Sequence, residues 1–201
     1  MAQFPQLEAY IKRLPHGLDS YPEALAKASL LRSVADVRPI PRQAREALPA
    51  SLATLLEAPP PVTHWVSQVH THALLLVLRD SVCSDQEDFV RFCYLRQREL
   101  FQSAMYRVMF ALATPGMLFR AFALRWGSLH RGTSLSIRER TDTSVHLELD
   151  HAAHLWDPEV SLATAAGLRV VLDLSGALGA TVEVGHSSDE QTVFHGQWTL
   201  P

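Results

Sequence analysis

The chain of 201 residues contains only two cysteines and two lysines, and it lacks long apolar runs. Its longest apolar runs, such as 73–78, have six positions, far fewer than the roughly 18 to 20 that cross a bilayer, so we predict no transmembrane segment. Cys83 and Cys93 lie ten positions apart in one predicted helix and the segment before it, which disfavours a disulfide. Reduced thiols and the absence of a secretion signal predict a cytoplasmic protein.

Common catalytic and phosphate-binding motifs are also missing. The sequence has no Gly-x-Ser-x-Gly nucleophile elbow, no Gly-x-x-x-x-Gly-Lys phosphate loop and no Gly-x-Gly-x-x-Gly turn. The formal net charge of −3 argues against general nucleic-acid binding. We therefore predict a protein that is not an enzyme, that holds no cofactor and that does not bind nucleic acid.

What the sequence does contain is the composition of a packed protein, with 47% hydrophobic and 19% charged residues. The length fits one domain. We predict a single α+β domain over 1–201, mainly helical over 1–131 and followed by a ββαββ unit over 132–201. This fold class is a helical layer packed on a four-stranded antiparallel sheet.

Helical periodicity dominates the first 131 residues. Apolar positions recur at three- and four-residue steps after Pro22, over 62–79, and again from Thr114-Pro115 to Trp126. A weaker helix over 42–57 contains Pro49 and is consistent with two pieces. The nearly apolar stretch 106–113 adds to the predicted core.

After Gly132 the apolar period changes from 3.6 to 2. Two alternating segments around Leu135 and Leu147 predict a hairpin. Asp157-Pro158 predicts a helix start, with the aspartate as N-cap, and Gly176 predicts its end. Two further alternating segments predict a closing hairpin whose apolar face packs on the helices.

Charge is unevenly distributed along the chain. Residues 91–140 carry nine arginines against two acids, a net of +7, and residues 141–201 carry one arginine against nine acids, a net of −8. Sixteen of the eighteen basic residues are arginine, and a GC-rich genome whose codons favour arginine is one explanation of this excess. The other is an arginine-lined face for an anionic partner or for the acidic C-terminal third of a second copy, and the two opposed blocks predict a homodimer or a protein partner.

The best candidate binding residues lie on or just after one predicted helix: Arg120, Arg125, Trp126 and His130. Arg125 suits a carboxylate or phosphate, and Trp126 suits the apolar wall of a pocket. The structural alternative is that Trp126 belongs to the core and that both arginines are solvated.

Histidines and cysteines offer weaker candidates. His151, His154 and Asp157 are of metal-ligand type, but they fall in a predicted loop and Asp157 is explained as a helix cap. His70 and His72 point in different directions on a helix. Cys83 precedes a predicted helix start and is a candidate for modification. We predict no metal site and no catalytic residue.

The C-terminal half resembles a known superfamily. An apolar helix pair, Trp126-Gly127, a hairpin, a helix ending in Ser175-Gly176-Ala177 and a closing hairpin to Trp198 resemble the TRAPP-like and 4-vinyl-reductase-like superfamily, to which haem nitric-oxide-binding domains are distantly similar. Ser20-Tyr21-Pro22, 27–32 and Arg125-Trp126 resemble a paralogous family of myxobacteria.

The resemblance implies a fold, a homodimer and an apolar pocket that in relatives holds an acyl chain, an aromatic effector or a tetrapyrrole. Zinc-binding relatives use cysteines near the closing hairpin, and residues 141–201 contain none. Haem-binding relatives carry Tyr-x-Ser-x-Arg beside an axial histidine, and this chain has no such pattern. Both metal-dependent functions are weakened.

Three functional hypotheses follow. The leading one is a non-enzymatic, self-associating or protein-binding adaptor in a regulatory or trafficking-like system. The alternative is a small-molecule sensor that binds an apolar, acyl or aromatic ligand in a pocket between helices and sheet. The third is a histidine-dependent metalloprotein or enzyme.

Overall fold

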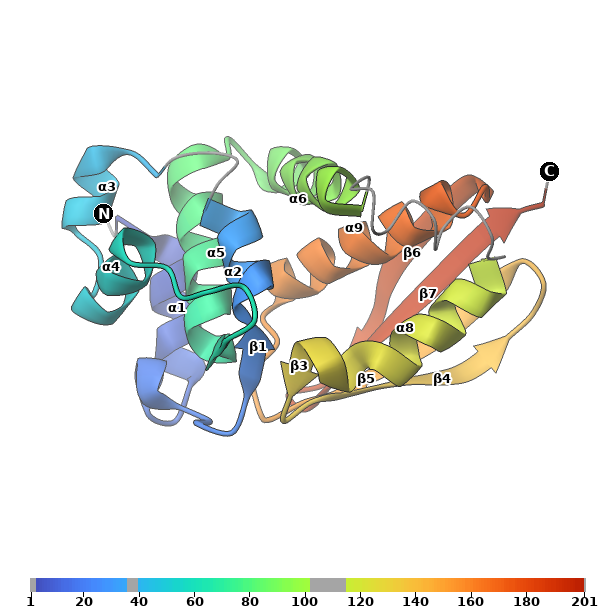
Figure 1. Cartoon of the computed structure of the whole chain (residues 1–201), viewed down its shortest axis with the longest axis horizontal. Helices are drawn as coiled ribbons and strands as arrows, with labels where there is room; N and C mark the ends of the chain where they lie inside the picture. The colour runs from blue at the N-terminus through green and yellow to red at the C-terminus, as the bar shows by residue number, and fades with distance from the viewer. Residues whose placement is uncertain (1–2, 36–39, 102–114, 201) are drawn as a thin grey trace.

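The computed structural model describes residues 3–35, 40–101 and 115–200. It is an α+β structure with two antiparallel sheets, which confirms the predicted fold class. The first helices gather at one end of the molecule and the larger sheet lies at the other (Figure 1). The predicted apolar stretch 106–113 lies outside the described residues.

The helical part is organised around one buried helix. It contains α1 (Pro5–Arg13), η1 (Gly17–Asp19), α2 (Ala28–Ala35), α3 (Arg42–Glu46), α4 (Ala50–Glu57), α5 (Gln68–Val82) and α6 (Gln86–Phe101). Helix α5 starts where the Ser67 hydroxyl accepts from the His70 N–H, and its run 73–78 is buried against α1, α2 and α4. As predicted, the segment 42–57 forms two pieces, with Pro49 as the N-cap of α4.

A small sheet within this region was missed by the sequence analysis. Strands β1 (Leu25–Lys27), β2 (Trp65–Ser67) and β3 (His130–Arg131) pair in the order β2-β1-β3. The prediction that 25–27 and 65–67 are helical was wrong. Strands of two or three residues show no period of two, and pairing between distant segments decides their conformation.

The C-terminal ββαββ unit is confirmed. It comprises β4 (Ser134–Arg140), β5 (Ser144–Asp150), α9 (Pro158–Leu174), β6 (Leu178–Ser187) and β7 (Gln191–Thr199), with strand order β4-β5-β7-β6. Leu147 lies opposite Ile137 on one side and Phe194 on the other. The carboxylate of Asp157 caps α9 by accepting from the Glu159 N–H at 2.8 Å.

Two helices cover one face of this sheet. Helix α8 (Pro115–Leu129) packs on β4, and α9 packs on β6 and β7 (Figure 1). Gly132 turns the chain from β3 into β4 at φ +73°, and a Cβ there would lie 3.0 Å from the Ala24 Cα, so only glycine lets β3 approach β1 this closely. The turn therefore sets the position of His130.

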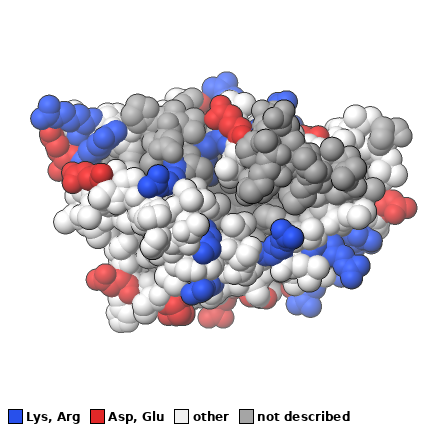
Figure 2. Space-filling model, in the orientation of Figure 1, with Lys and Arg blue, Asp and Glu red and all other residues white. Residues whose placement is uncertain are grey.

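Basic and acidic side chains are both spread across the face of the molecule that Figure 2 shows. A homodimer or a protein partner driven by charge complementarity stays a prediction. Within the described ranges, no helix combines the length and apolarity that crossing a membrane requires.

Candidate functional site

A pocket of about 150 Å³ lies where the helical part meets the sheet-covering helices. It is partly open, and most of its lining is apolar. Helix α5 supplies Gln68 and His72, α8 and β3 supply Trp126 and His130, and the loop before α9 supplies Trp156. Further walls come from β1, α2, α6 and α9, through Ala26, Ser29, Leu30, Thr71, Leu75, Arg96, Gln97, Leu100, Phe101, Phe122, Leu129, Val160, Ala163, Thr164, Gly167, Leu168 and Val171.

Aromatic rings form one side of the pocket. Trp126 stacks on His130 with ring centroids 4.0 Å apart and an interplanar angle of 16°. Trp156 meets the edge of His72 at 4.6 Å and lies 6.1 Å from Trp126. Both indole N–H groups are used by threonine hydroxyls, since Trp126 donates to Thr133 and Trp156 to Thr164. Both rings are therefore anchored in place.

A buried hydrogen-bond network joins α5 to β3. His72 Nδ1 lies 3.0 Å from the Leu155 carbonyl oxygen. The Gln68 amide nitrogen lies 3.4 Å from His72 Nε2 and 3.1 Å from His130 Nδ1. Burial lowers the pKa of His72 to about 4 and that of His130 to about 3, so both imidazoles are neutral near pH 7.

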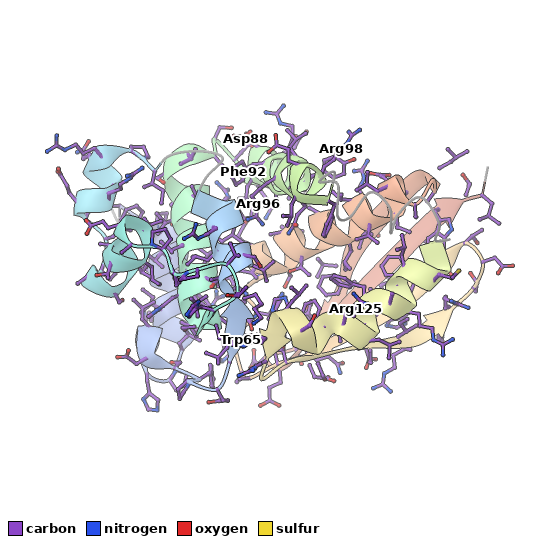
Figure 3. All side chains as sticks on the ribbon, viewed as in Figure 1. Trp65, Asp88, Phe92, Arg96, Arg98 and Arg125 are labelled. Carbon is purple, nitrogen blue, oxygen red and sulfur yellow. The ribbon has the colours of Figure 1, made fainter. Side chains whose placement is uncertain are left out.

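Helix α6 contributes a basic group to the same pocket. Figure 3 places Arg96 on the side of α6 that faces the rest of the molecule, and Arg98 on its outer side. The Arg96 side chain is buried, and burial lowers the pKa of its guanidinium. The pocket therefore combines apolar walls with one buried basic group from α6.

The structure separates the four residues singled out from sequence. Trp126 and His130 line the pocket, whereas Arg120 and Arg125 are exposed on α8. Figure 3 labels Arg125 on that helix. A ligand-binding role for all four stays a prediction. Sequence reasoning missed Gln68 and Trp156. The i, i+4 spacing of Gln68 and His72 was a usable signal, because such residues share a helix face.

The metal-type residues of the loop have other partners. His151 contacts the Thr192 hydroxyl and the Ala152 carbonyl, His154 lies 3.2 Å from Asp189, and Asp157 pairs with Arg13. Among the described residues, no three His, Cys, Asp or Glu side chains are grouped to hold a metal ion. A second hollow of about 420 Å³ lies here, and two of these pairs line it, Arg13 with Asp157 and His154 with Asp189.

The two cysteines are both free thiols. Cys93 is buried in the core, where burial raises its thiol pKa to about 12. Cys83 is half-buried at the end of α5. Modification of Cys83 stays a prediction.

Solved structures resemble this arrangement of helices and sheet. The Fe(II) unliganded H-NOX protein from K. algicida is 9% identical, with a TM-score of 0.55 over 87% of this chain and 97% of that one. This likeness decides the fold. The chain has an H-NOX-like fold.

Two further structures agree. An oxygen-binding H-NOX domain related to soluble guanylate cyclases is 7% identical, with a TM-score of 0.56 over 86% of this chain and 93% of that one. A point variant of the T. tengcongensis H-NOX is 8% identical, with a TM-score of 0.55 over 86% and 95%. No protein-family model and no curated protein matches the sequence. The haem-NO-binding part of the predicted resemblance is thus confirmed at the level of the fold, and its TRAPP-like part stays a prediction.

The H-NOX-like fold raises the question whether the pocket fits a haem. A haem belongs at the upper end of the roughly 300–1,000 Å³ that ligand sites span, and this pocket has about 150 Å³. Trp126 covers the face of His130, and one ring nitrogen of each pocket histidine lies within 3.4 Å of the Gln68 amide nitrogen. The described residues do not fit a haem.

Proposed function

We propose that this protein is a ligand-binding sensor domain that holds a compact apolar or aromatic molecule in the pocket between helices and sheet, without haem. The observation that carries the proposal is the pocket itself, about 150 Å³ and walled mainly by apolar side chains. An apolar cavity on the order of 150 Å³ binds molecules the size of benzene or xenon. The H-NOX-like fold supports the same function by likeness, because one such neighbour is an oxygen-binding domain.

These observations favour the sensor hypothesis over the adaptor hypothesis. An adaptor needs only an outer surface, whereas this chain keeps a hollow and two largely buried histidines at its centre. Burying a polar group without a hydrogen-bond partner lowers the free energy of unfolding. The domain transmits binding through another protein or a second copy, in line with the predicted homodimer or protein partner.

Two glycines provide a matched test of where a ligand binds. Gly167 on α9 lines the pocket, and a Cβ there would meet the Gln97 side chain at an ordinary 3.5 Å. Gly127 on α8 is exposed, with no atom within 4 Å of the corresponding Cβ. Leucine at either position gains similar helix propensity, about 1 kcal/mol. Only leucine at position 167 adds side-chain volume to the pocket.

Toluene is the probe, and binding is measured by NMR titration of the full chain. We expect the wild type and Gly127→Leu to bind with equal affinity and Gly167→Leu to bind at least about tenfold more weakly. Gly167→Ala supplies a smaller obstruction if the leucine variant does not fold. No toluene binding to the wild type, or equal binding by the two leucine variants, contradicts the proposed function.

A further inference from the structure

The Gln68 amide has one orientation that its neighbours permit. The Leu155 carbonyl accepts hydrogen bonds only, so the His72 nitrogen 3.0 Å away, Nδ1, carries the proton. His72 is neutral, which leaves Nε2 as a bare acceptor. The Gln68 atom facing that acceptor must be the donating NH₂ group, because a carbonyl oxygen there would place two lone pairs against each other.

The second imidazole is compatible with the same orientation, with His130 Nδ1 as the acceptor. The Gln68 NH₂ group also lies 3.1 Å from His130 Nδ1, and His130 is neutral. The two amide hydrogens thus go to two ring nitrogens. Trp126 holds the His130 ring in place by stacking on it. Both donors of the amide are used, and its carbonyl oxygen points away from the histidines.

That oxygen has no partner. Gln68 is fully buried, and within the described part of the chain its Oε1 accepts no hydrogen bond. Buried side-chain acceptors are nearly always paired, so an unpaired one needs an explanation. Gln68 lines the pocket, so the free acceptor belongs to a residue of the pocket wall.

We propose that Gln68 Oε1 is the specificity-determining acceptor of this pocket, and that it selects compact aromatic ligands carrying one N–H or O–H donor over donor-free ligands of the same shape. The inference rests on the proposed function. Trp126 and Trp156 supply the apolar walls for the ring, and the Gln68 oxygen takes the donor. An apolar pocket alone discriminates weakly between such ligands, whereas an unpaired buried acceptor penalises the ligand that lacks a donor.

Aniline and toluene test this selection, because they share one outline and differ in NH₂ against CH₃. The measured quantity is the ratio of the toluene Kd to the aniline Kd, determined for the wild type and for Gln68→Met. Because both proteins bind the same two ligands, comparing the wild-type ratio with the Gln68→Met ratio cancels the difference in hydration free energy between toluene and aniline. We expect the wild-type ratio to exceed the Gln68→Met ratio by at least about tenfold.

Gln43→Met is the matched control. Gln43 is exposed on α3, outside the pocket, so the same chemical change there is expected to leave the ratio unchanged. If Gln68→Met does not fold, pyrrole and furan are compared on the wild type alone, with pyrrole expected to bind at least about tenfold more tightly.

The outcomes separate the two proposals. If toluene binds but Gln68→Met leaves the ratio of the toluene Kd to the aniline Kd unchanged, the role of Gln68 is overturned and the proposed function stands. A water molecule held on Oε1 would give this result. An equal fall of the ratio in Gln43→Met overturns the role of Gln68 as well. Failure of both toluene and aniline to bind overturns the proposed function itself.

Discussion

Purified from cells that supply haem, the protein is expected to carry no stoichiometric haem and to show no Soret band above that of free haem. The physical reason is the size and filling of the pocket. About 150 Å³ remains between helices and sheet, and Trp126 and Trp156 hold fixed positions in its wall. Accommodating a macrocycle would require both indoles to leave a packed aromatic cluster, at a cost of several kcal/mol.

Absorbance spectroscopy with a pyridine haemochrome assay measures this directly. The oxygen-binding H-NOX domain, expressed and purified in parallel, is the control for haem supply. Haemin added to the purified chain is expected to bind no more tightly than it binds an unrelated protein. One haem per chain, with a spectrum of histidine-ligated iron, would falsify the statement that this pocket excludes haem.

The second large effect is a loss of stability on mild acidification. The pKa of His72 is about 4 and that of His130 about 3 in the folded protein, against about 6.5 in an unfolded chain. Between these values the unfolded state binds protons that the folded state does not. The free energy of unfolding therefore falls as pH drops below about 6.5, by about 1 kcal/mol per pH unit for each histidine.

Urea unfolding at about pH 7 and about pH 5.5 measures the effect. Burial also lowers the pKa values of His70 and His151, which act in the same direction as His72 and His130, whereas burial raises those of Asp80 and Asp157, which act in the opposite direction. His72→Gln removes one titrating group and is expected to flatten the pH dependence. His186→Gln, at an exposed position on β6, is expected to follow the wild type. A wild-type stability that is constant over this window contradicts the neutral, buried state of the two histidines.

Local chemistry explains which parts of the fold were predictable. The ββαββ unit was, because alternating apolar residues and the Asp157-Pro158 start encode it within short segments. The small sheet was not, since β1 pairs with strands 40 and more than 100 residues away and each strand is only two or three residues long. Such pairings depend on tertiary packing rather than on local pattern.

The candidate site also combines residues that the local sequence identifies with residues that only the fold brings together. Trp126 and His130 were identified because they lie on or just after a helix that carries arginines, and both line the pocket. Trp156 reaches them from thirty residues away, in a loop whose position is set by the sheet and by α9. The free oxygen of Gln68 depends on the tautomer of His72, which depends on the Leu155 carbonyl. No sequence pattern encodes that chain of contacts.

The most direct test of the central claim is a crystal structure of the full chain soaked with bromobenzene and recorded at the bromine absorption edge. The account predicts one anomalous peak inside the pocket, between Gly167 of α9 and the indoles of Trp126 and Trp156. A peak only on the surface or in the second hollow beside Arg13 and Asp189, or a pocket that stays closed to the probe, contradicts it.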